Sequence, residues 1–416
     1  MKILFLTPQL PYPPHQGTTI RNLNILRGLA TRHEIDLLAF GRRDELQGTP
    51  LAQYCRRIEL VDAPARSPLR RIAETFASPL PDMARRLHSP DMSQAFLSMT
   101  SESRYDAIQI EGIEMAPYWL SSGLALRFGG SGQHSSPFVL FDDHNAEYVL
   151  QKTAFEADSR RIDRLPAALY SLIQWHKLSR FERDLCLRAD CVAAVSQHDA
   201  NALHALDSRI RPAVIPNGVD LDYYSPATES STREPARPAL VFTGKMDFRP
   251  NIDAALWFAR EILPLIRREI PGAHFSLVGQ KPAPTVQALA ERPGVEVTGA
   301  VPDTRPYIGR AAVYLVPLRM GGGTRLKVLE AMAMGKAIVS TSMGAEGIEY
   351  RPDRDLLIAD DPGIFASAVV ALLRNPERRR ALGWNARRLA AEKYDWNAIV
   401  PLFDKLLAGQ RGSPAR

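Results

Sequence analysis

The sequence has few cysteines and no long apolar run. Its three cysteines, Cys55, Cys186 and Cys191, have neither the spacing of metal ligands nor that of a disulfide framework, and such cysteines indicate reduced thiols in a cytoplasmic protein. No segment approaches the roughly 20 apolar residues of a membrane-spanning helix. The apolar run that opens the chain stops at Thr7 and Pro8, too early for a signal peptide. We therefore expect neither export nor insertion into a membrane.

Two further signatures are missing. No Gly-x-Gly-x-x-Gly fingerprint follows the first predicted strand, where the sequence reads PQLPYPPHQGTTI, and this excludes the commonest way of binding NAD. The formal net charge of +6 is modest for 416 residues and is not concentrated in one segment. Such a balance fits an anionic substrate or an acidic membrane surface, and we expect no nucleic-acid partner.

The patterns that are present indicate an α/β protein of two domains. A chain of 416 residues, 45% of them hydrophobic and 24% charged, is typical of a folded soluble protein and is too long for one ordinary core. Short apolar runs alternate with longer helical patterns, which predicts parallel sheets covered on both faces. Helices are predicted at 18–31 and 163–189, and strands at 2–7, 34–40, 58–61, 106–111, 138–143, 191–196, 239–244, 274–279, 295–299, 313–317 and 337–341.

A polar, proline-rich segment interrupts this alternation. Residues 225–238 read SPATESSTREPARP and have no periodicity, which predicts a surface linker. The alternation of strands and helices restarts after it, so the chain contains two α/β units in tandem. Because ligands of open parallel sheets bind beyond the carboxyl ends of the strands, we expect the substrates to lie in a cleft between the two units.

Three consecutive glycines, Gly321 to Gly323, precede a predicted helix that starts near Thr324. Glycines allow sharp bends and close approach of a ligand, and a helix N-terminus favours an anion. One interpretation is that the helix amides with Arg325 or Lys327 hold a diphosphate while Glu330 binds both hydroxyls of a ribose. The alternative, a surface pair between Lys327 and Glu330, leaves the glycines unexplained.

Two other loops could also approach a phosphate. Lys245 and Arg249 follow a predicted strand and precede a helix expected near Pro250, so either cation could bind a phosphate, although solvated surface cations are an equal alternative. Gly17 ends a proline-rich loop before the first helix, where it would let the backbone approach a substrate or would simply form a rigid connection.

The segment FDDHNAEY ends another predicted strand. Asp142 and Asp143 suggest a metal site, but adjacent side chains on a strand point to opposite faces, which makes them poor joint ligands. We therefore predict no metal and consider a structural or helix-capping role for the aspartates. His144 titrates near neutrality and is predicted to face the cleft as a proton carrier or hydroxyl partner.

Several segments together resemble one enzyme family. PPHQG, DDHNAEY, VIPNGVD, VFTGKMDFRPN and GGGTRLKVLEAMAMGKAIVS occur in the order found in the GT-B fold retaining glycosyltransferases of family 4. The resemblance implies two Rossmann-like α/β/α domains facing across a cleft. By this pattern residues 1–215 form an N-terminal acceptor-binding domain, 216–392 a C-terminal nucleotide-sugar-binding domain, and 393–416 a helix that returns to the first domain.

The resemblance also implies the roles of the site residues. Gly17 would lie beside the donor phosphates, and the catalytic positions would be His144 near the transferred sugar, Lys245 on the diphosphate and Glu330 on the ribose.

This chain departs from the family pattern at two places. Gly322 replaces the first of two glutamates, so the contact with the sugar hydroxyls is missing or is made by a backbone N–H. The second phosphate-binding cation has no clean match, and Arg249, Arg325 and Lys327 are candidate replacements. Gly322, Gly323 and Thr324 are therefore included with these cations in the predicted donor site.

The activity implied by the resemblance is transfer of a hexose from a nucleoside diphosphate sugar, with retention and without cofactor or metal. The acceptor would be a glycan or a lipid-linked sugar in bacterial surface polysaccharide or glycoconjugate synthesis. A nucleotide-sugar epimerase and a non-catalytic sugar-binding module, which fits Gly322, are the alternatives.

The segment 65–90 bears on the location of the protein. Its five arginines are interleaved with apolar residues, a pattern that fits contact with an anionic membrane at the inner face of the plasma membrane. A solvated basic face is the commoner explanation for such a pattern.

Overall fold

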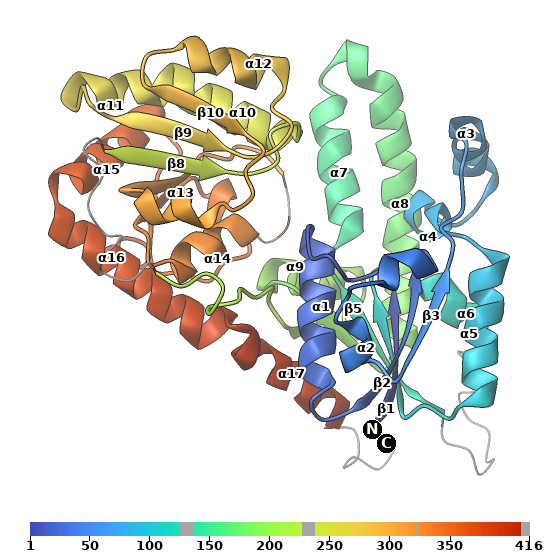
Figure 1. The fold of residues 1–416 in the computed structure, drawn as a ribbon. Coiled ribbons are helices and arrows are strands. Elements are labelled where there is room, and N and C mark those ends of the chain that lie inside the picture. Colours follow the sequence, from blue (N-terminus) through green and yellow to red (C-terminus); the bar gives the residue numbers. More distant parts are fainter. Residues whose placement is uncertain (125–135, 227–237, 322, 324, 409–416) are drawn as a thin grey trace. The chain divides into compact units, whose positions relative to one another are not determined.

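The computed structural model describes residues 1–124, 136–226, 238–321, 323 and 325–408. The chain forms two compact units, each built around one parallel sheet (Figure 1). Unit 1 comprises Met1–Pro216 and Val400–Arg416, and unit 2 comprises Asn217–Ile399. Most of the predicted linker at 225–238 lies outside the described residues.

Unit 1 contains a seven-stranded parallel sheet of order β3-β2-β1-β4-β5-β6-β7. Its strands are β1 (Lys2–Thr7), β2 (Glu34–Phe40), β3 (Arg57–Val61), β4 (Ala107–Glu111), β5 (Phe138–Asp143), β6 (Cys191–Ala194) and β7 (Ala213–Val214). The central strands are buried along nearly their whole length and mostly apolar, with acidic residues at the carboxyl ends of β4 and β5, as expected for a sheet covered on both faces that carries its site at the strand ends.

The helices of unit 1 connect these strands. They are α1 (Gly17–Leu29), α2 (Leu51–Tyr54), α3 (Pro68–Ala77), α4 (Asp82–Arg86), α5 (Pro90–Glu102), α6 (Ala116–Leu120), α7 (Glu147–Asp158), α8 (Leu165–Arg188) and α9 (Gln197–Leu206). Figure 1 shows α7 and α8 side by side as a long green hairpin, with α3 beyond α8.

Unit 2 contains a six-stranded parallel sheet of order β10-β9-β8-β11-β12-β13. Its strands are β8 (Ala239–Thr243), β9 (His274–Val278), β10 (Val295–Gly299), β11 (Val313–Val316), β12 (Ile338–Ser340) and β13 (Leu357–Ile358). Its helices are α10 (Arg249–Trp257), α11 (Leu263–Glu269), α12 (Pro284–Gln287), α13 (Arg305–Arg310), α14 (Leu326–Ala333), α15 (Pro362–Arg374) and α16 (Pro376–Leu389).

The last described helix, α17 (Trp396–Ala408), contributes residues to both units and continues through Pro401. From Val400 onward it packs on α1 and on the turn that follows α1, since a Cβ at Gly28 would collide with Val400 at 2.5 Å and Asp404 lies 2.7 Å from the His33 ring. Gly28 therefore permits the close approach of the two helices.

The eleven strands predicted from the sequence are all present, with ends that differ by at most two residues. Two strands of two residues, β7 and β13, were not predicted because runs this short carry no pattern. The helix predicted to start near Thr324 is a correction: α14 begins at Leu326, with Arg325 at its N-cap.

Candidate functional site

In unit 2 several of the predicted side chains gather at the carboxyl end of β8. Lys327, in the first turn of α14, donates from Nζ to Oδ1 of Asn251 at 2.8 Å. The same ammonium lies 4.3 Å from the centre of the Phe242 ring. A Cβ added at Gly244 would lie 2.9 Å from Nζ, so the glycine after β8 makes room for this cation.

The environment of Lys327 perturbs its charge. Desolvation lowers the pKa of the ammonium to about 7, and the positive charge of Arg325 adds to this effect, whereas Glu330 opposes it. An anion that binds next to Lys327 would stabilise the charged form of the ammonium, because its negative charge replaces the hydration that the ammonium loses on burial.

Glu330 lies one turn further along α14. Burial raises the pKa of its carboxyl group, while a hydrogen bond with Tyr224 and the charge of Lys327 act in the opposite direction. Tyr314 lies nearby, and burial together with the charge of Glu330 raises the pKa of its phenol. Glu330 is thus a carboxyl group that is hydrogen-bonded to one phenol and close to a second, with hydrogen-bonding capacity suited to hydroxyl groups.

The glycine loop before α14 adopts an unusual backbone. Gly321 and Gly323 have φ values of 111° and 79°, which only glycine adopts readily. A Cβ at Gly321 would lie 3.2 Å from the Arg325 guanidinium. The Arg325 side chain is 10% exposed and lies 3.6 Å from Glu346. The predicted residues Gly322 and Thr324 lie outside the described part of the loop.

The other two predicted cations of unit 2 are exposed. Lys245 lies 3.7 Å from Asp247, and Arg249 is the first residue of α10. The backbone of Lys245 is nevertheless tied to the site, since its carbonyl accepts a hydrogen bond of 2.9 Å from Asn251. Asn251 therefore links the Lys245 backbone to the Lys327 ammonium.

In unit 1, His144 follows β5 and belongs to an ionic network. Its Nε2 lies 3.0 Å from Oε2 of Glu111 and 3.7 Å from Oδ2 of Asp142. Arg21 of α1 forms two bonds of 2.7 and 2.8 Å with the Asp142 carboxylate. Arg21, Glu111 and Asp142 are almost fully buried, so each charge depends on the others for compensation.

This network shifts the pKa values of its members. Burial opposes the charged form of His144, but the hydrogen bond that its Nε2 donates to Glu111, together with the charge of Asp142, outweighs burial and raises the pKa of the imidazole. Burial and the charge of Asp142 raise the pKa of Glu111 to about 7. The imidazole can therefore hold or move a proton near neutral pH.

The donor atoms of Glu111, Asp142 and His144 lie within 4.8 Å of one another, a grouping that could hold a cation. Arg21 already supplies a positive charge to Asp142 through two hydrogen bonds. The residues therefore fit a proton-sharing network better than a divalent ion. Asp143 turns to the other side of β5 and lines a cavity.

That cavity, of about 590 Å³, opens at the carboxyl ends of β1, β4 and β5, where the strand order of unit 1 reverses. Such a reversal is the expected ligand site of an open parallel sheet. His144 and Glu147 lie in its wall, as do Gln16 and Thr18 on either side of Gly17. Burial and the nearby charge of Glu114 raise the pKa of Glu147 to about 7.

The predicted site residues thus fall into two groups. Lys327, Glu330, Arg325 and the backbone of Lys245 meet in unit 2, whereas His144 lines the cavity in unit 1 together with Gln16 and Thr18, the two neighbours of Gly17.

Sequence reasoning missed four participants: Asn251, Tyr224, Arg21 and Glu111. Their partners are remote in sequence, and no local pattern marks them; Asn251, for example, is separated from Lys327 by 76 positions.

Two family models match the sequence. Residues 16–223 match Glycosyltransferase Family 4, and residues 237–375 match Glycosyl transferases group 1. The first model alone covers half of the chain. The chain belongs to glycosyltransferase family 4. The predicted family is thereby confirmed.

Family 4 relatives with curated names include mannosyltransferases. A phosphatidyl-myo-inositol mannosyltransferase of Propionibacterium freudenreichii is 30% identical over 236 residues, which are 55% of this chain and 59% of the relative. A GDP-mannose-dependent alpha-(1-6)-phosphatidylinositol monomannoside mannosyltransferase of Mycolicibacterium smegmatis is 26% identical over 218 residues, 47% of this chain and 56% of the relative. The chain spans about half the length of the curated relatives it matches.

Solved structures establish the fold. Sucrose-phosphate synthase from Thermosynechococcus elongatus has a TM-score of 0.69 at 20% identity, with all of both chains covered. The Anabaena protein HepE in complex with UDP and glucose has a TM-score of 0.66 at 15% identity, covering 98% of this chain and all of HepE. These similarities confirm a GT-B type fold of two Rossmann-like domains for this family 4 member.

Proposed function

We propose that this protein is a retaining glycosyltransferase that moves a hexose from a nucleoside diphosphate sugar to a glycan or lipid-linked acceptor. The observation that carries the proposal is the Lys327 ammonium held by Asn251 and flanked by Glu330 at the end of β8. The mannosyltransferase names of the relatives and the UDP bound to HepE support a nucleotide-sugar donor.

Lys327 is the best candidate for the second phosphate-binding cation. Its desolvated ammonium donates a hydrogen bond to the Asn251 side chain, which in turn donates to the backbone carbonyl of Lys245. Asn251 therefore brings the two lysines to the same part of the site. Arg325 instead lies beside Glu346, and Arg249 is exposed at the start of α10. In this proposal Lys245 and Lys327 hold the diphosphate together.

Glu330 and Tyr224 supply the hydroxyl-binding part of the donor site. A carboxylate accepts two hydrogen bonds from a vicinal diol, and the Tyr224 phenol already orients the carboxyl group. The pair therefore suits the ribose of the donor. Gly322 stands where the family has another glutamate, so in this chain the sugar hydroxyls are expected to meet backbone rather than a carboxylate.

The chemistry requires stabilisation of a leaving group. As the bond to the anomeric carbon breaks, negative charge grows on the departing diphosphate, and fixed cations such as Lys245 and Lys327 stabilise that charge in place. Because these cations supply the positive charge, we propose that the reaction needs no metal. His144 in unit 1 holds a proton near neutral pH and would bind a hydroxyl of the transferred hexose.

The cavity of unit 1 is the proposed acceptor site. Its wall combines the Arg86–Glu114 ion pair with Glu147, whose pKa of about 7 allows it to donate or accept a hydrogen bond at neutral pH. Such a lining suits the hydroxyls of a sugar. None of the helices in the described part of the chain has both the length and the apolar composition of a membrane span. We propose a cytoplasmic enzyme of surface-polysaccharide or glycoconjugate synthesis that contacts the inner face of the plasma membrane peripherally.

A thermal-shift panel tests the donor site. UDP, GDP, their monophosphates and the corresponding nucleotide sugars are added to the full chain, and one diphosphate is expected to raise the melting temperature selectively by mass action. Lys327→Met should abolish the preference for the diphosphate over the monophosphate, whereas Lys393→Met, an exposed control in unit 2, should not. Equal shifts for every nucleotide would contradict the assignment.

Product analysis with the selected donor tests the reaction. NMR should show transfer to acceptor with the anomeric configuration retained and with undiminished rate in excess chelator. An epimerised donor formed without acceptor would indicate an epimerase. Binding with neither transfer nor slow donor hydrolysis would indicate a non-catalytic module.

A further inference from the structure

Helix α3 of unit 1 exposes its apolar side. Leu69, Ile72 and Phe76 are 80%, 58% and 68% exposed, and their spacing of three and four residues places them on one stripe of the helix. A surface helix of a soluble domain normally turns such a stripe toward the core. Single exposed apolar residues need no explanation, but three on one stripe indicate an interaction surface.

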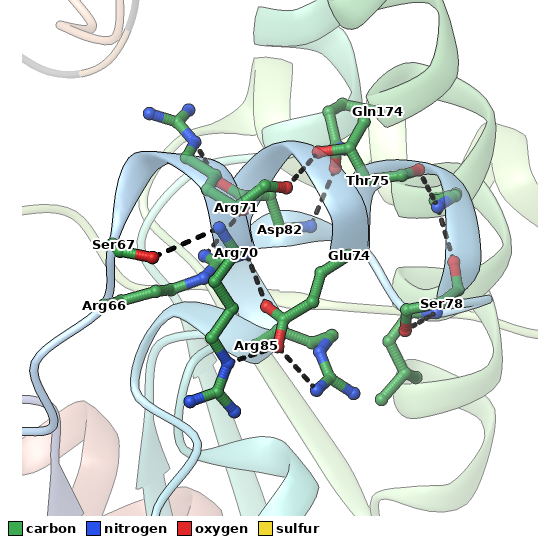
Figure 2. Close-up of polar contacts among 12 residues, drawn as sticks. Arg66, Ser67, Arg70, Arg71, Glu74, Thr75, Ser78, Asp82, Arg85 and Gln174 are labelled. Carbon is green, nitrogen blue, oxygen red and sulfur yellow. Dashed lines mark hydrogen bonds and ion pairs between the residues drawn. The ribbon is translucent and has the colours of Figure 1, made fainter.

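An ionic network explains why the helix faces this way. Glu74 on the polar side of α3 pairs with Arg66, Arg70 and Arg85 at 2.8, 2.9 and 3.0 Å. Figure 2 shows Arg70 and Arg85 converging on the Glu74 carboxylate. Hydrogen bonds from Arg85 and Arg70 outweigh the effect of desolvation and lower the pKa of Glu74 to about 2. The carboxylate thus remains charged at any physiological pH.

A second acid fixes the same side of α3 to its neighbours. Asp82 at the start of α4 pairs with Arg66 at 2.7 Å and with Arg71 at 3.1 Å, and it accepts from the Tyr170 hydroxyl at 2.9 Å. Its backbone N–H donates to Gln174 of α8 at 2.7 Å (Figure 2). The charged side of α3 is therefore engaged by α4 and α8, and the apolar stripe is held toward solvent.

Lys177 of α8 anchors the end of α3. Its ammonium donates to the carbonyls of Thr75 and Ser78 at 2.6 and 2.5 Å. A cation at the carbonyl end of a helix is favourable. Turning the apolar stripe inward would break these bonds along with the ion pairs of Glu74 and Asp82, so the exposure of the stripe is a fixed feature of the fold.

The charges around the stripe indicate its partner. Residues 65–90 contain five arginines and two acids, and Arg70 and Arg71 beside the stripe are 58% and 54% exposed. Three apolar side chains are far fewer than a stable protein interface of about 800 Å² per partner requires. An apolar stripe flanked by arginines suits instead the interface of an anionic bilayer.

The residues that hold α3 also border the cavity of unit 1. Arg71, Asp82 and Tyr170 line it while binding one another. A membrane that touched α3 would therefore lie beside one wall of the proposed acceptor site.

We propose that α3 docks on an anionic bilayer through Leu69, Ile72 and Phe76, and that the acceptor enters the unit 1 cavity from that bilayer as a lipid-linked sugar. The identity of the acceptor rests on the proposed function, but the docking does not. Arg70 and Arg71 attract the anionic headgroups, and the three apolar side chains enter the interface.

Co-sedimentation of the full chain with vesicles tests the docking. Vesicles of phosphatidylcholine mixed with phosphatidylglycerol should bind the protein more strongly than vesicles of phosphatidylcholine alone, and high salt should weaken the binding. The triple variant Leu69→Ser, Ile72→Ser, Phe76→Ser should lower the partition coefficient by about tenfold or more, because each side chain loses apolar burial.

A matched control variant carries Leu97→Ser, Ile364→Ser and Trp384→Ser, at positions 48%, 62% and 62% exposed on other helices. It should bind vesicles like the unchanged protein. Equal losses in the two variants, or equal binding of the unchanged protein to neutral and anionic vesicles, would overturn the proposal.

A single variant reports the docking directly. The tryptophan fluorescence of Phe76→Trp, measured as the difference from the unchanged protein, should shift to the blue on anionic vesicles, and an unshifted difference spectrum would contradict insertion of α3. The thermal shift with the donor nucleotide separates the two proposals. It should be the same in the triple variant, so loss of docking leaves the donor site intact, whereas failure of the donor assignment would leave vesicle binding intact.

Discussion

Binding of the donor diphosphate is expected to be coupled to protonation of Lys327. The pKa of this ammonium is about 7 in the structure, compared with an ordinary value of 10.5. About half of the molecules therefore lack this charge at about pH 7, and about nine tenths lack it at about pH 8. A bound diphosphate favours the charged form, so binding should take up the missing proton.

The pKa of Lys327 sets how proton uptake and the dissociation constant of the diphosphate change with pH. Below about pH 7 the ammonium is charged in the free protein, so little proton uptake is expected. Above it, uptake should approach one proton per diphosphate, and the dissociation constant should rise by up to about tenfold for each pH unit. Lys327→Met removes the titrating group, and we expect it to weaken binding by about 30-fold or more through loss of a desolvated charged hydrogen bond.

Isothermal titration calorimetry measures the uptake directly. The heat of nucleotide binding is recorded in buffers of different ionisation enthalpy, and its dependence on the buffer gives the number of protons exchanged. The phosphate itself also titrates, but Lys327→Met retains that contribution, so the difference between the two proteins isolates the lysine. Proton uptake that is the same in both proteins, or that does not change with pH, would refute a desolvated Lys327 in contact with the diphosphate.

Three further predictions follow from the site. Arg21→Met should lower the free energy of unfolding of unit 1 by about 3 kcal/mol or more, measured by urea denaturation, since it leaves the buried Asp142 carboxylate without its counter-charge. A change below about 1 kcal/mol would show that Asp142 does not carry a buried charge that depends on Arg21. Lys245→Ala should reduce kcat by about 10² to 10³, whereas the exposed control Lys393→Ala should keep the rate of the unchanged enzyme, and an equally active Lys245→Ala enzyme would remove this lysine from the mechanism. NMR titration of His144 should give a pKa above its usual value that falls in Glu111→Gln, and an unaltered titration in that variant would contradict the hydrogen bond that raises it.

Prediction from the sequence succeeded where the physical cause is local. The strands were found because residues such as those of β1 and β5 form continuous apolar runs bounded by turn residues, and a buried parallel strand requires nothing more. The start of α14 was placed two residues too early, because a threonine after glycines suggests an N-cap. Left-handed φ values at Gly321 and Gly323 instead carry the loop as far as Arg325 before the helix begins.

The candidate site was predicted in part. Lys327 and Glu330 were named because a glycine loop before a helix suggests an anion site, yet two interpretations remained open for the pair. The ammonium is bound to Asn251 and stands against the Phe242 ring. These contacts come from α10 and β8, and they favour the functional interpretation over a surface ion pair.

The sequence alone determined the α/β class, the two-domain organisation and the family, because apolar runs and ordered motifs are written along the chain. Only the tertiary structure decided which charges meet. Arg21 finds Asp142 across 121 positions, and Lys327 finds Asn251 across 76. Only the structure also shows that α3 faces outward, since an amphipathic pattern predicts a stripe but not the side on which its neighbours pack. The order of the strands in the sheet decides which distant residues become neighbours, and ion pairs between distant residues decide which side of α3 packs against the protein. Neither leaves a local pattern in the sequence.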